Sequence, residues 1–396
     1  MSVAKRAYQG EMLRFNRQMK RPLQLVADMM PIGFTDEEYY KTFKVCFAGL
    51  WHTIEEKKRT YDLMDKERKR KHQEPIYFFP QPDDFLAKQS CAIRNKTRNK
   101  HQQDQILSEA ERKALKAKYE TRSKQREAAK EKKKTEITEL QQAVTPKFAN
   151  YFIKTYFYVK RTHPEDVNTR MRILEEAAKF KCAETISLMF KVNAAERNFK
   201  LREFAFLTLQ KQFGYPQVHL HRNRNGKLHP GDDLMPRKMD TPQLLMEEIY
   251  QSEYNLEQNK KFDVFLSHSS KDKEAIIKLK AMLNRQGLTV YIDWIEDRNA
   301  LKRELTSVYT ARALTERINH SRAVLYVLSE TGITSVWTPW ELGYAQALGK
   351  KICVLPMETN IKAPEYLEIY KKAIVEVDRV FVMVDDKTLP IEGWVL

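Results

Sequence analysis

The sequence lacks the cysteine patterns that build disulfide frameworks or zinc knuckles. Its four cysteines lie far apart and form no Cys-x-x-Cys pair: Cys46, Cys91, Cys182 and Cys353. No N-terminal charged segment leads into an apolar core, and no apolar run approaches the roughly 20 residues that a membrane-spanning helix needs. These absences argue against a disulfide-stapled secreted scaffold and a helical membrane protein. We therefore expect a soluble, cytoplasmic protein without membrane contact.

Several binding signatures are missing as well. No Gly-x-Gly-x-x-Gly follows an expected strand and no P-loop lysine motif occurs, which argues against a dehydrogenase and an NTPase. No RNP, KH or helix-turn-helix motif organises the basic residues. His219, His221 and His229 have no helical spacing or cysteine partner that would fix a metal geometry, so no metal site is expected.

The positive charge is concentrated in the N-terminal part of the chain. The formal net charge is +17; residues 1–260 hold 51 Lys and Arg against 35 Asp and Glu, while residues 261–396 hold 19 against 18. This division indicates two tasks, with the basic part suited to a nucleic acid or an acidic protein partner. A solubilising surface explains the same charge equally well.

A long charged helix is expected within a mainly helical N-terminal region. Ser108 and Glu111 form a capping-box pattern, and the charge-rich stretch that follows predicts a helix over about residues 108–144. Its apolar positions are too sparse for a stable coiled coil. An isolated helix, a helical hairpin arm and a partly disordered linker all fit this pattern.

A packed helical bundle is expected after Pro146, because apolar residues recur there at helical spacing. The bundle is followed by Asn225-Gly226 between polar arms, a pair typical of a type I′ hairpin turn. Residues 242–260 predict a short helix and a polar linker.

The pattern changes near Asn259, which predicts a domain boundary between residues 1–258 and residues 259–396. Beyond the boundary, short apolar runs alternate with amphipathic stretches. Five strands are expected, at residues 261–267, 288–294, 322–329, 351–357 and 380–384. Near-continuous apolar strands that alternate with helices indicate an α/β fold, a doubly wound, flavodoxin-like parallel sheet of five strands.

Polar and aromatic residues follow the ends of these strands. In a doubly wound sheet, ligands bind beyond the carboxyl ends of the strands, where the strand order reverses. The candidate site residues there are Ser267, His268, Ser269, Trp294, Trp337 and Glu341. Glu341 is a single carboxylate among aromatic side chains at the start of a helix, which makes it the candidate catalytic group.

Two segments resemble a Toll/interleukin-1 receptor (TIR) domain of bacterial type. One spans residues 261–294, from KFDVFLSHSS to YIDW; the other, SVWTPWELGYAQALGKKICVLPM, has the Trp-x-x-x-Glu spacing of the family from Trp337 to Glu341. The similarity says nothing about residues 1–250. The loop at residues 295–309 departs from the family because it lacks the usual glycine and proline.

The resemblance implies an enzyme that cleaves NAD+, with NAD+ as substrate and no resident cofactor. The glutamate of the family corresponds to Glu341, which would engage the ribose next to nicotinamide. Its place in the first turn of a helix predicts an ionised carboxylate. The expected substrate contacts are stacking by Trp294 or Trp337 and polar contacts from Ser267, His268 and Ser269. Attack by water would give a linear product and attack by an atom of the substrate a cyclic one; both stay open.

Three functions follow as hypotheses. The first is a bacterial antiphage defence effector, in which the basic region senses a trigger and the TIR domain cleaves NAD+ as a homo-oligomer held by TIR–TIR contacts. The second is a non-catalytic TIR scaffold or adaptor. The third is a nucleic-acid-binding module that carries a TIR effector. Glu341 in its aromatic setting favours the enzyme.

Overall fold

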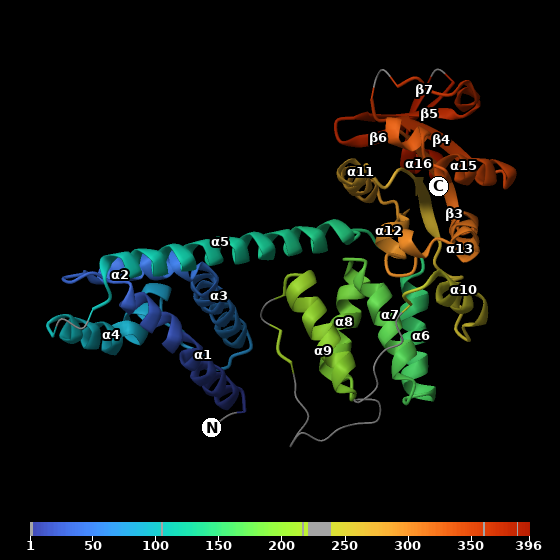
Figure 1. The fold of residues 1–396 in the computed structure, drawn as a ribbon. Helices are drawn as coiled ribbons and strands as arrows, with labels where there is room; N and C mark the ends of the chain where they lie inside the picture. Colours follow the sequence, from blue (N-terminus) through green and yellow to red (C-terminus); the bar gives the residue numbers. More distant parts are fainter. Residues whose placement is uncertain (1–2, 104–105, 216–217, 221–238, 359–360, 386) are drawn as a thin grey trace. The chain divides into compact units, whose positions relative to one another are not determined.

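The chain forms two compact units in the computed structural model. The model describes residues 3–103, 106–215, 218–220, 239–358, 361–385 and 387–396. The first unit ends at Glu136 and the second begins at Ile137, so the chain passes from one to the other inside a long helix (Figure 1). Among the described residues, no helix combines the length and the apolar character that crossing a membrane requires.

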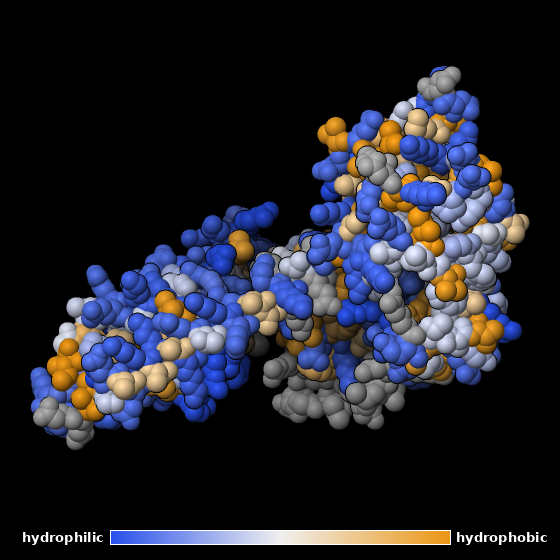
Figure 2. Space-filling model, turned by 45° about the horizontal axis from the view of Figure 1, so that its top comes forward, coloured by the Kyte–Doolittle hydropathy of each residue, from blue (hydrophilic) through white to orange (hydrophobic). Residues whose placement is uncertain are grey.

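Helices make up the first unit. They are α1 (Val3–Asp28), α2 (Asp36–Cys46), α3 (Ala48–Arg70), α4 (Pro82–His101) and α5 (Glu109–Leu140), which continues into the second unit. The side chain of Thr35 caps α2 by accepting from the backbone N–H of Glu38, whose own side chain accepts from the N–H of Thr35. Buried aromatic side chains such as Phe15, Phe43 and Phe85 form the core. On the face that Figure 2 shows, hydrophilic side chains cover most of this unit.

The long helix α5 begins as the sequence predicts. Ser108 Oγ accepts a hydrogen bond from the N–H of Glu111, and the Glu111 carboxylate accepts one of 2.9 Å from the N–H of Ser108. The helix ends at Leu140, earlier than predicted. Its apolar residues Leu115 and Tyr119 pack against the core of the first unit, so this part of α5 is not an isolated helix.

Helices also open the second unit. They are α6 (Ala149–Thr162), α7 (Val167–Ala178), α8 (Ala183–Ala195), α9 (Phe199–Leu207), the π-helical turn η1 (Thr208–Gln212) and α10 (Pro242–Gln251). These helices confirm the predicted bundle after Pro146. The hairpin predicted at Asn225-Gly226 lies outside the described residues, as do His221 and His229.

A seven-stranded sheet fills the C-terminal part of the second unit. Its strands are β1 (Phe262–Ser267), β2 (Val290–Tyr291), β3 (Ser321–Leu328), β4 (Lys351–Pro356), β5 (Lys371–Glu376), β6 (Arg379–Val384) and β7 (Lys387–Pro390). Between them lie α11 (Lys273–Arg285), α12 (Asp293–Glu296), η3 (Arg303–Leu305), α13 (Val308–Asn319), α14 (Glu330–Ile333), α15 (Trp337–Ala347) and η4 (Glu365–Ile369), and α16 (Ile391–Val395) follows β7. The order is β2-β1-β3-β4-β5-β6-β7. The sheet is parallel from β2 to β5, which is the flavodoxin-like order 2-1-3-4-5 and confirms the predicted fold class.

The predicted number of strands is wrong. The run at residues 380–384, expected as a fifth parallel strand, belongs to β6, which pairs antiparallel with the unpredicted β5 and is followed by the antiparallel β7. The turn between β5 and β6 places Val377 at φ 44° and Asp378 at φ 61°. Such left-handed turn positions usually carry Asn or Gly. Because neither residue occurs there, the sequence carries no hairpin signal at this point.

Helices cover both faces of the sheet. α11 and α16 pack on the face that contains Val264 and Leu266 of β1. α13 and α15 pack on the opposite face, which contains Phe265 of β1 and Val324 of β3. This arrangement leaves the carboxyl ends of the parallel strands at one edge of the sheet.

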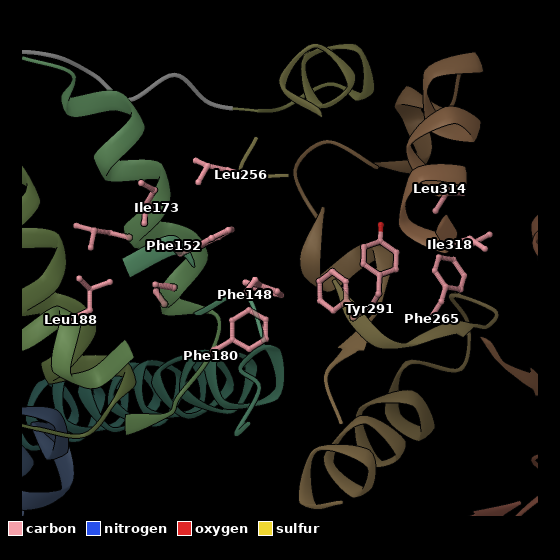
Figure 3. Close-up of a cluster of buried hydrophobic side chains, with 14 of the residues drawn as sticks. Phe148, Phe152, Ile173, Phe180, Leu188, Leu256, Phe265, Tyr291, Leu314 and Ile318 are labelled. Carbon is pink, nitrogen blue, oxygen red and sulfur yellow. The ribbon is translucent and has the colours of Figure 1, made fainter. Parts of the chain in front are cut away.

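The helical bundle and the sheet share one hydrophobic core. Phe148, next to α6, meets the ring of Phe262 edge to face with 5.9 Å between centroids, and Phe262 meets Tyr291 in the same way at 5.4 Å. Figure 3 shows this cluster, with side chains from the bundle and from the sheet. The two parts therefore bury apolar surface together. The domain boundary predicted between residues 258 and 259 falls inside this unit and stays a prediction.

Candidate active site

The candidate site lies where the order of the strands reverses. β2 is on one side of β1, and β3 and β4 are on the other. β1 ends at Ser267, β3 is followed by Ser329, and α12 begins at Asp293 directly after β2. Ligands of doubly wound sheets bind outside such a point. The fold thus gathers several of the predicted residues at one edge.

Glu341 points into this edge from α15. Its side chain is buried, with 7% of the residue exposed. The Ser267 hydroxyl donates a hydrogen bond of 2.6 Å to Glu341 Oε2. α15 is anchored near its start, because Thr338 Oγ1 donates a hydrogen bond of 2.8 Å to the carbonyl oxygen of Gly332. The structure therefore brings the predicted catalytic carboxylate into contact with one of the predicted substrate-binding residues.

The environment of Glu341 favours the protonated carboxyl group. Burial is the largest cause and raises its pKa to about 8; the hydrogen bond from Ser267 lowers the pKa, and the Asp293 carboxylate raises it further. The expected ionised carboxylate is therefore wrong for the ligand-free protein. Glu341 lies just past the first turn of α15, where the field of the helix end is weak and lost hydration outweighs it.

His268 and Trp294 form a second contact between predicted residues. The indole Nε1–H of Trp294 donates a hydrogen bond of 2.8 Å to His268 Nε2. Since indole can only donate, Nε2 accepts, and the ring proton of the neutral imidazole is on Nδ1, 2.9 Å from the carbonyl oxygen of Leu266. Both ring nitrogens are engaged. In this state His268 orients Trp294 and is not available as a base.

Trp337 and Ser269 have other partners. Trp337 packs against the core of the sheet and meets Trp340 edge to face, with 5.6 Å between ring centroids. Ser269 is buried, and its Oγ accepts a hydrogen bond of 3.4 Å from the N–H of Lys271 within the loop after β1. The roles of these two residues, and of His268 and Trp294, in substrate binding stay predictions.

Asp272 is a residue at this edge that the sequence did not single out. The hydroxyls of Ser329 and Thr331 donate to its carboxylate at 2.5 and 2.9 Å, which ties the start of α11 to the end of β3. Asp272 is the N-cap position of α11 but makes no capping hydrogen bond. An aspartate directly before a helix predicts a helix cap, so the sequence gives no sign that Asp272 joins α11 to the end of β3. Across the described part of the chain, no cluster of three or more His, Cys, Asp or Glu side chains is arranged for a metal ion.

A buried network of charged side chains fixes the residues after α12. Arg317, on α13, is 1% exposed; its Nε donates to Asp297 at 2.8 Å and its Nη2 donates to Glu257 at 2.5 Å. The hydroxyl of Tyr291 also donates to Asp297, at 2.9 Å. Burial raises the pKa values of Asp297 and Glu257, but the neighbouring cations lower them below their ordinary values: Arg317 acts most strongly on Asp297, and Lys260, followed by Arg317, on Glu257.

Comparison with known proteins agrees with the fold of the C-terminal part. A family model for the TIR domain matches residues 264–385. Over 361 residues the chain is 31% identical to a Cytobacillus dafuensis protein provisionally named cyclic ADP-D-ribose synthase TIR2, and the match covers 88% of this chain and 90% of the relative. The chain therefore belongs to the TIR-domain family, as its sequence motifs predict.

A second relative matches the C-terminal part. ThsB′ of Bacillus cereus (strain MSX-D12), provisionally named a 3′ cyclic ADP-D-ribose synthase, is 37% identical over 131 residues, which is 32% of this chain and 66% of the relative. The match to TIR2 is much longer and extends into the N-terminal region, where the sequence motifs reveal no family.

Proposed function

We propose that the protein cleaves the bond between nicotinamide and ribose in NAD+ and closes the remaining ADP-ribose into a cyclic product. The proposal rests on one observation, the buried Glu341 carboxyl with the Ser267 hydroxyl 2.6 Å away at the switch point of the sheet. The names of both relatives, cyclic ADP-ribose synthases, support the substrate and the cyclic product. NAD+ is a substrate in this scheme, and no resident cofactor is required.

The chemistry needs a negative charge and no acid. When the bond from the ribose carbon to the pyridinium nitrogen breaks, its electron pair neutralises the ring, and nicotinamide leaves without a proton. The ribose becomes an oxocarbenium-like cation, which the ionised Glu341 carboxylate would stabilise. A bound pyridinium cation favours that ionisation, because an opposite charge nearby lowers a carboxyl pKa. Ser267 would hold the carboxylate in place.

The cyclic product requires an internal nucleophile. An adenine nitrogen or a ribose hydroxyl of the same molecule adds to the cationic carbon, and a hydroxyl nucleophile releases its proton to solvent. Water at the same carbon would give linear ADP-ribose and a proton. Exclusion of water therefore decides between the two products. Stacking of a substrate ring on Trp294 or Trp337 would fold the substrate toward its own ribose.

In this proposal the enzyme serves bacterial antiphage defence in the cytoplasm. The N-terminal region senses a trigger and switches the enzyme on, and TIR–TIR contacts between copies complete the assembly. Residues 1–136 hold 32 Lys and Arg against 20 Asp and Glu, a charge that suits an acidic protein or nucleic acid as the trigger. The same charge supports a second candidate function, a nucleic-acid-binding module. Binding that weakens steeply with salt would favour it.

The test is nicotinamide release from NAD+ by the full-length protein, with products separated by chromatography. Glu341→Gln keeps the volume of the side chain and removes its charge, and we expect release to fall by about 100-fold or more. Glu376→Gln, an exposed glutamate on β5, is the matched control and should keep full activity. Undiminished release by Glu341→Gln would overturn the role of Glu341. No release by the wild type with any trigger would favour the scaffold.

A further inference from the structure

Gln142 lies in the short segment between α5 and α6 and is completely buried. Its backbone pairs with the helical bundle: its N–H donates to the carbonyl oxygen of Lys179, and its carbonyl oxygen accepts from the N–H of Lys181, both at 2.8 Å. This pairing forms an isolated parallel bridge with Phe180. The backbone of Gln142 is thus fixed to the end of α7.

The side chain of Gln142 faces the other way, toward the sheet. Its Oε1 accepts a hydrogen bond of 3.0 Å from the N–H of Val290, and its Nε2 donates one of 2.9 Å to the carbonyl oxygen of the same residue. Nε2 also donates to Glu296 Oε1 at 2.6 Å, and Asn284 donates to Gln142 Oε1 at 3.3 Å. One amide side chain therefore satisfies both outward backbone groups of Val290.

These hydrogen bonds matter because β2 is the edge strand of the sheet and has only two residues. An edge strand leaves backbone N–H and C=O groups unpaired on its outer side, and buried groups of this kind need partners. Gln142 supplies them in place of a neighbouring strand. Without this side chain, only the pairing with β1 would hold β2 in place.

The strand that Gln142 holds leads directly into the candidate site. α12 follows β2 and carries Trp294, whose indole N–H reaches His268 at 2.8 Å, next to Ser267. Glu296, at the end of the same short helix, is the second partner of the Gln142 amide. A shift of β2 or α12 would therefore move the indole and the loop that carries His268, directly after Ser267.

A second set of contacts fastens the same junction. Lys280, on α11, is 3% exposed and donates to the backbone carbonyl oxygens of Glu139 and Gln141, the latter at 2.8 Å, where α5 ends. Lys179 donates a hydrogen bond of 2.6 Å to the carbonyl oxygen of Glu296. The end of α5 is thus fixed to α11 and, through Gln142, to β2 and α12.

We propose that Gln142 is a positioning residue for the active site, which holds β2 and α12 in register and couples the end of α5 to Trp294 and His268. This inference rests on the proposed NAD+ cleavage for its catalytic consequence. Its structural part, the support of β2, does not depend on any activity. Gln142 lies outside residues 264–385, the segment that matches the TIR domain, so the site depends on a residue that the domain itself lacks.

The structural part is tested by hydrogen exchange of the full-length protein. Gln142→Met keeps a side chain of similar length and removes its hydrogen bonds to Val290. We expect the amides of residues 288–297 to exchange roughly tenfold faster, while those of residues 322–328 in the central β3 keep their protection. Gln141→Met is the matched control, because the Gln141 side chain donates to the carbonyl oxygen of Ala178 in the helical bundle, at 3.4 Å. Unchanged exchange at residues 288–297 would overturn the proposal.

The catalytic part is tested by the kinetics of the same variants. We expect kcat for nicotinamide release to fall roughly tenfold or more in Gln142→Met with a smaller change in KM, and Gln141→Met to behave as wild type. Gln142→Glu loses the N–H group that donates to the carbonyl oxygen of Val290 and places a second carboxylate beside Glu296, so it should be slower than Gln142→Met. A wild-type kcat in Gln142→Met would overturn the positioning role. Faster hydrogen exchange confined to residues 288–297 in Gln142→Met, together with a wild-type protein that never cleaves NAD+, would support the structural part and overturn only the proposed function.

Discussion

The Ser267 hydroxyl donates a hydrogen bond of 2.6 Å to the Glu341 carboxyl group, from the end of β1 to a helix packed on the same sheet. The two residues are 74 positions apart in the chain. Burial opposes the negative charge on Glu341, and the hydroxyl group favours it. The site therefore keeps a carboxyl group protonated at neutral pH but ready to ionise when a cation binds.

The first prediction concerns the pH dependence of NAD+ cleavage. The ionised carboxylate is the active form, and its pKa in the free protein is about 8, so kcat/KM should rise with pH, reach half its maximum near pH 8 and level off above it. The bound pyridinium cation lowers this pKa, so kcat should level off at a lower pH than kcat/KM. Initial rates of nicotinamide release across this range measure both curves. A kcat/KM that does not change between about pH 6 and pH 9 would contradict the assignment.

The second prediction concerns Ser267→Ala. The substitution removes the hydrogen bond that lowers the pKa of Glu341, so the pKa should rise further and the kcat/KM curve should move to higher pH. At neutral pH we expect a loss of about 10-fold or more, the usual worth of a hydrogen bond to a charged group. Ser321→Ala is the matched control, because Ser321 is also buried and donates only to the carbonyl oxygen of Arg317, at the other end of the sheet. Equal pH profiles for both variants would speak against the role of Ser267.

The third prediction concerns the stability of Glu341→Gln. The folded protein keeps a proton on Glu341 up to about pH 8, whereas the unfolded chain loses it near its ordinary value of 4.5. Between these values the folded state binds more protons, so this carboxyl group makes the protein less stable as the pH rises. Glu341→Gln should therefore gain free energy of unfolding relative to the wild type, on the order of 3 kcal/mol at pH 7 and nothing below pH 4.

Denaturant unfolding at several pH values measures this gain. Glu376→Gln, at an exposed position, should follow the wild-type curve throughout. A difference between Glu341→Gln and wild type that stays constant with pH would mean that the side chain affects stability through packing, and that its ionisation is not suppressed in the folded protein.

Much of the fold is predictable from the sequence because the buried parallel strands leave a direct pattern. β1, β3 and β4 appear as continuous apolar runs, since both faces of the sheet are covered. β5 is less visible: three of its six residues are charged, at Lys371, Lys372 and Glu376, because it lies toward the exposed side of the sheet. β2 is much shorter than its apolar run at residues 288–294, because α12 begins at Asp293.

The sequence indicates candidate residues for the site but not the electrostatics around them. Ser267 stands out because it ends an expected strand, and Glu341 because of its Trp-x-x-x-Glu spacing from Trp337. The raised pKa of Glu341 depends on burial by segments far away in the sequence, which no local pattern reports. Gln142 is hidden for the same reason, since a glutamine between two helices predicts an exposed loop residue until the strand edge that it covers is known.

The last prediction concerns Arg317, whose guanidinium joins Asp297 to Glu257 in the interior. Arg317→Leu leaves two buried carboxylates without their shared partner, although Glu257 keeps ion pairs of 2.6 Å with Arg172 and 2.9 Å with Lys260. Removing one member of a buried ion pair costs about 3–5 kcal/mol, so the denaturation midpoint should fall sharply. The half-exposed Arg322 is the matched control: its Nε lies 3.7 Å from Asp263, and Arg322→Leu should cost less than about 1 kcal/mol. Because Asp297 directly follows α12, Arg317→Leu should also slow nicotinamide release in the molecules that remain folded. A variant that loses stability but keeps full activity per folded molecule would show that the network supports the core and not the site.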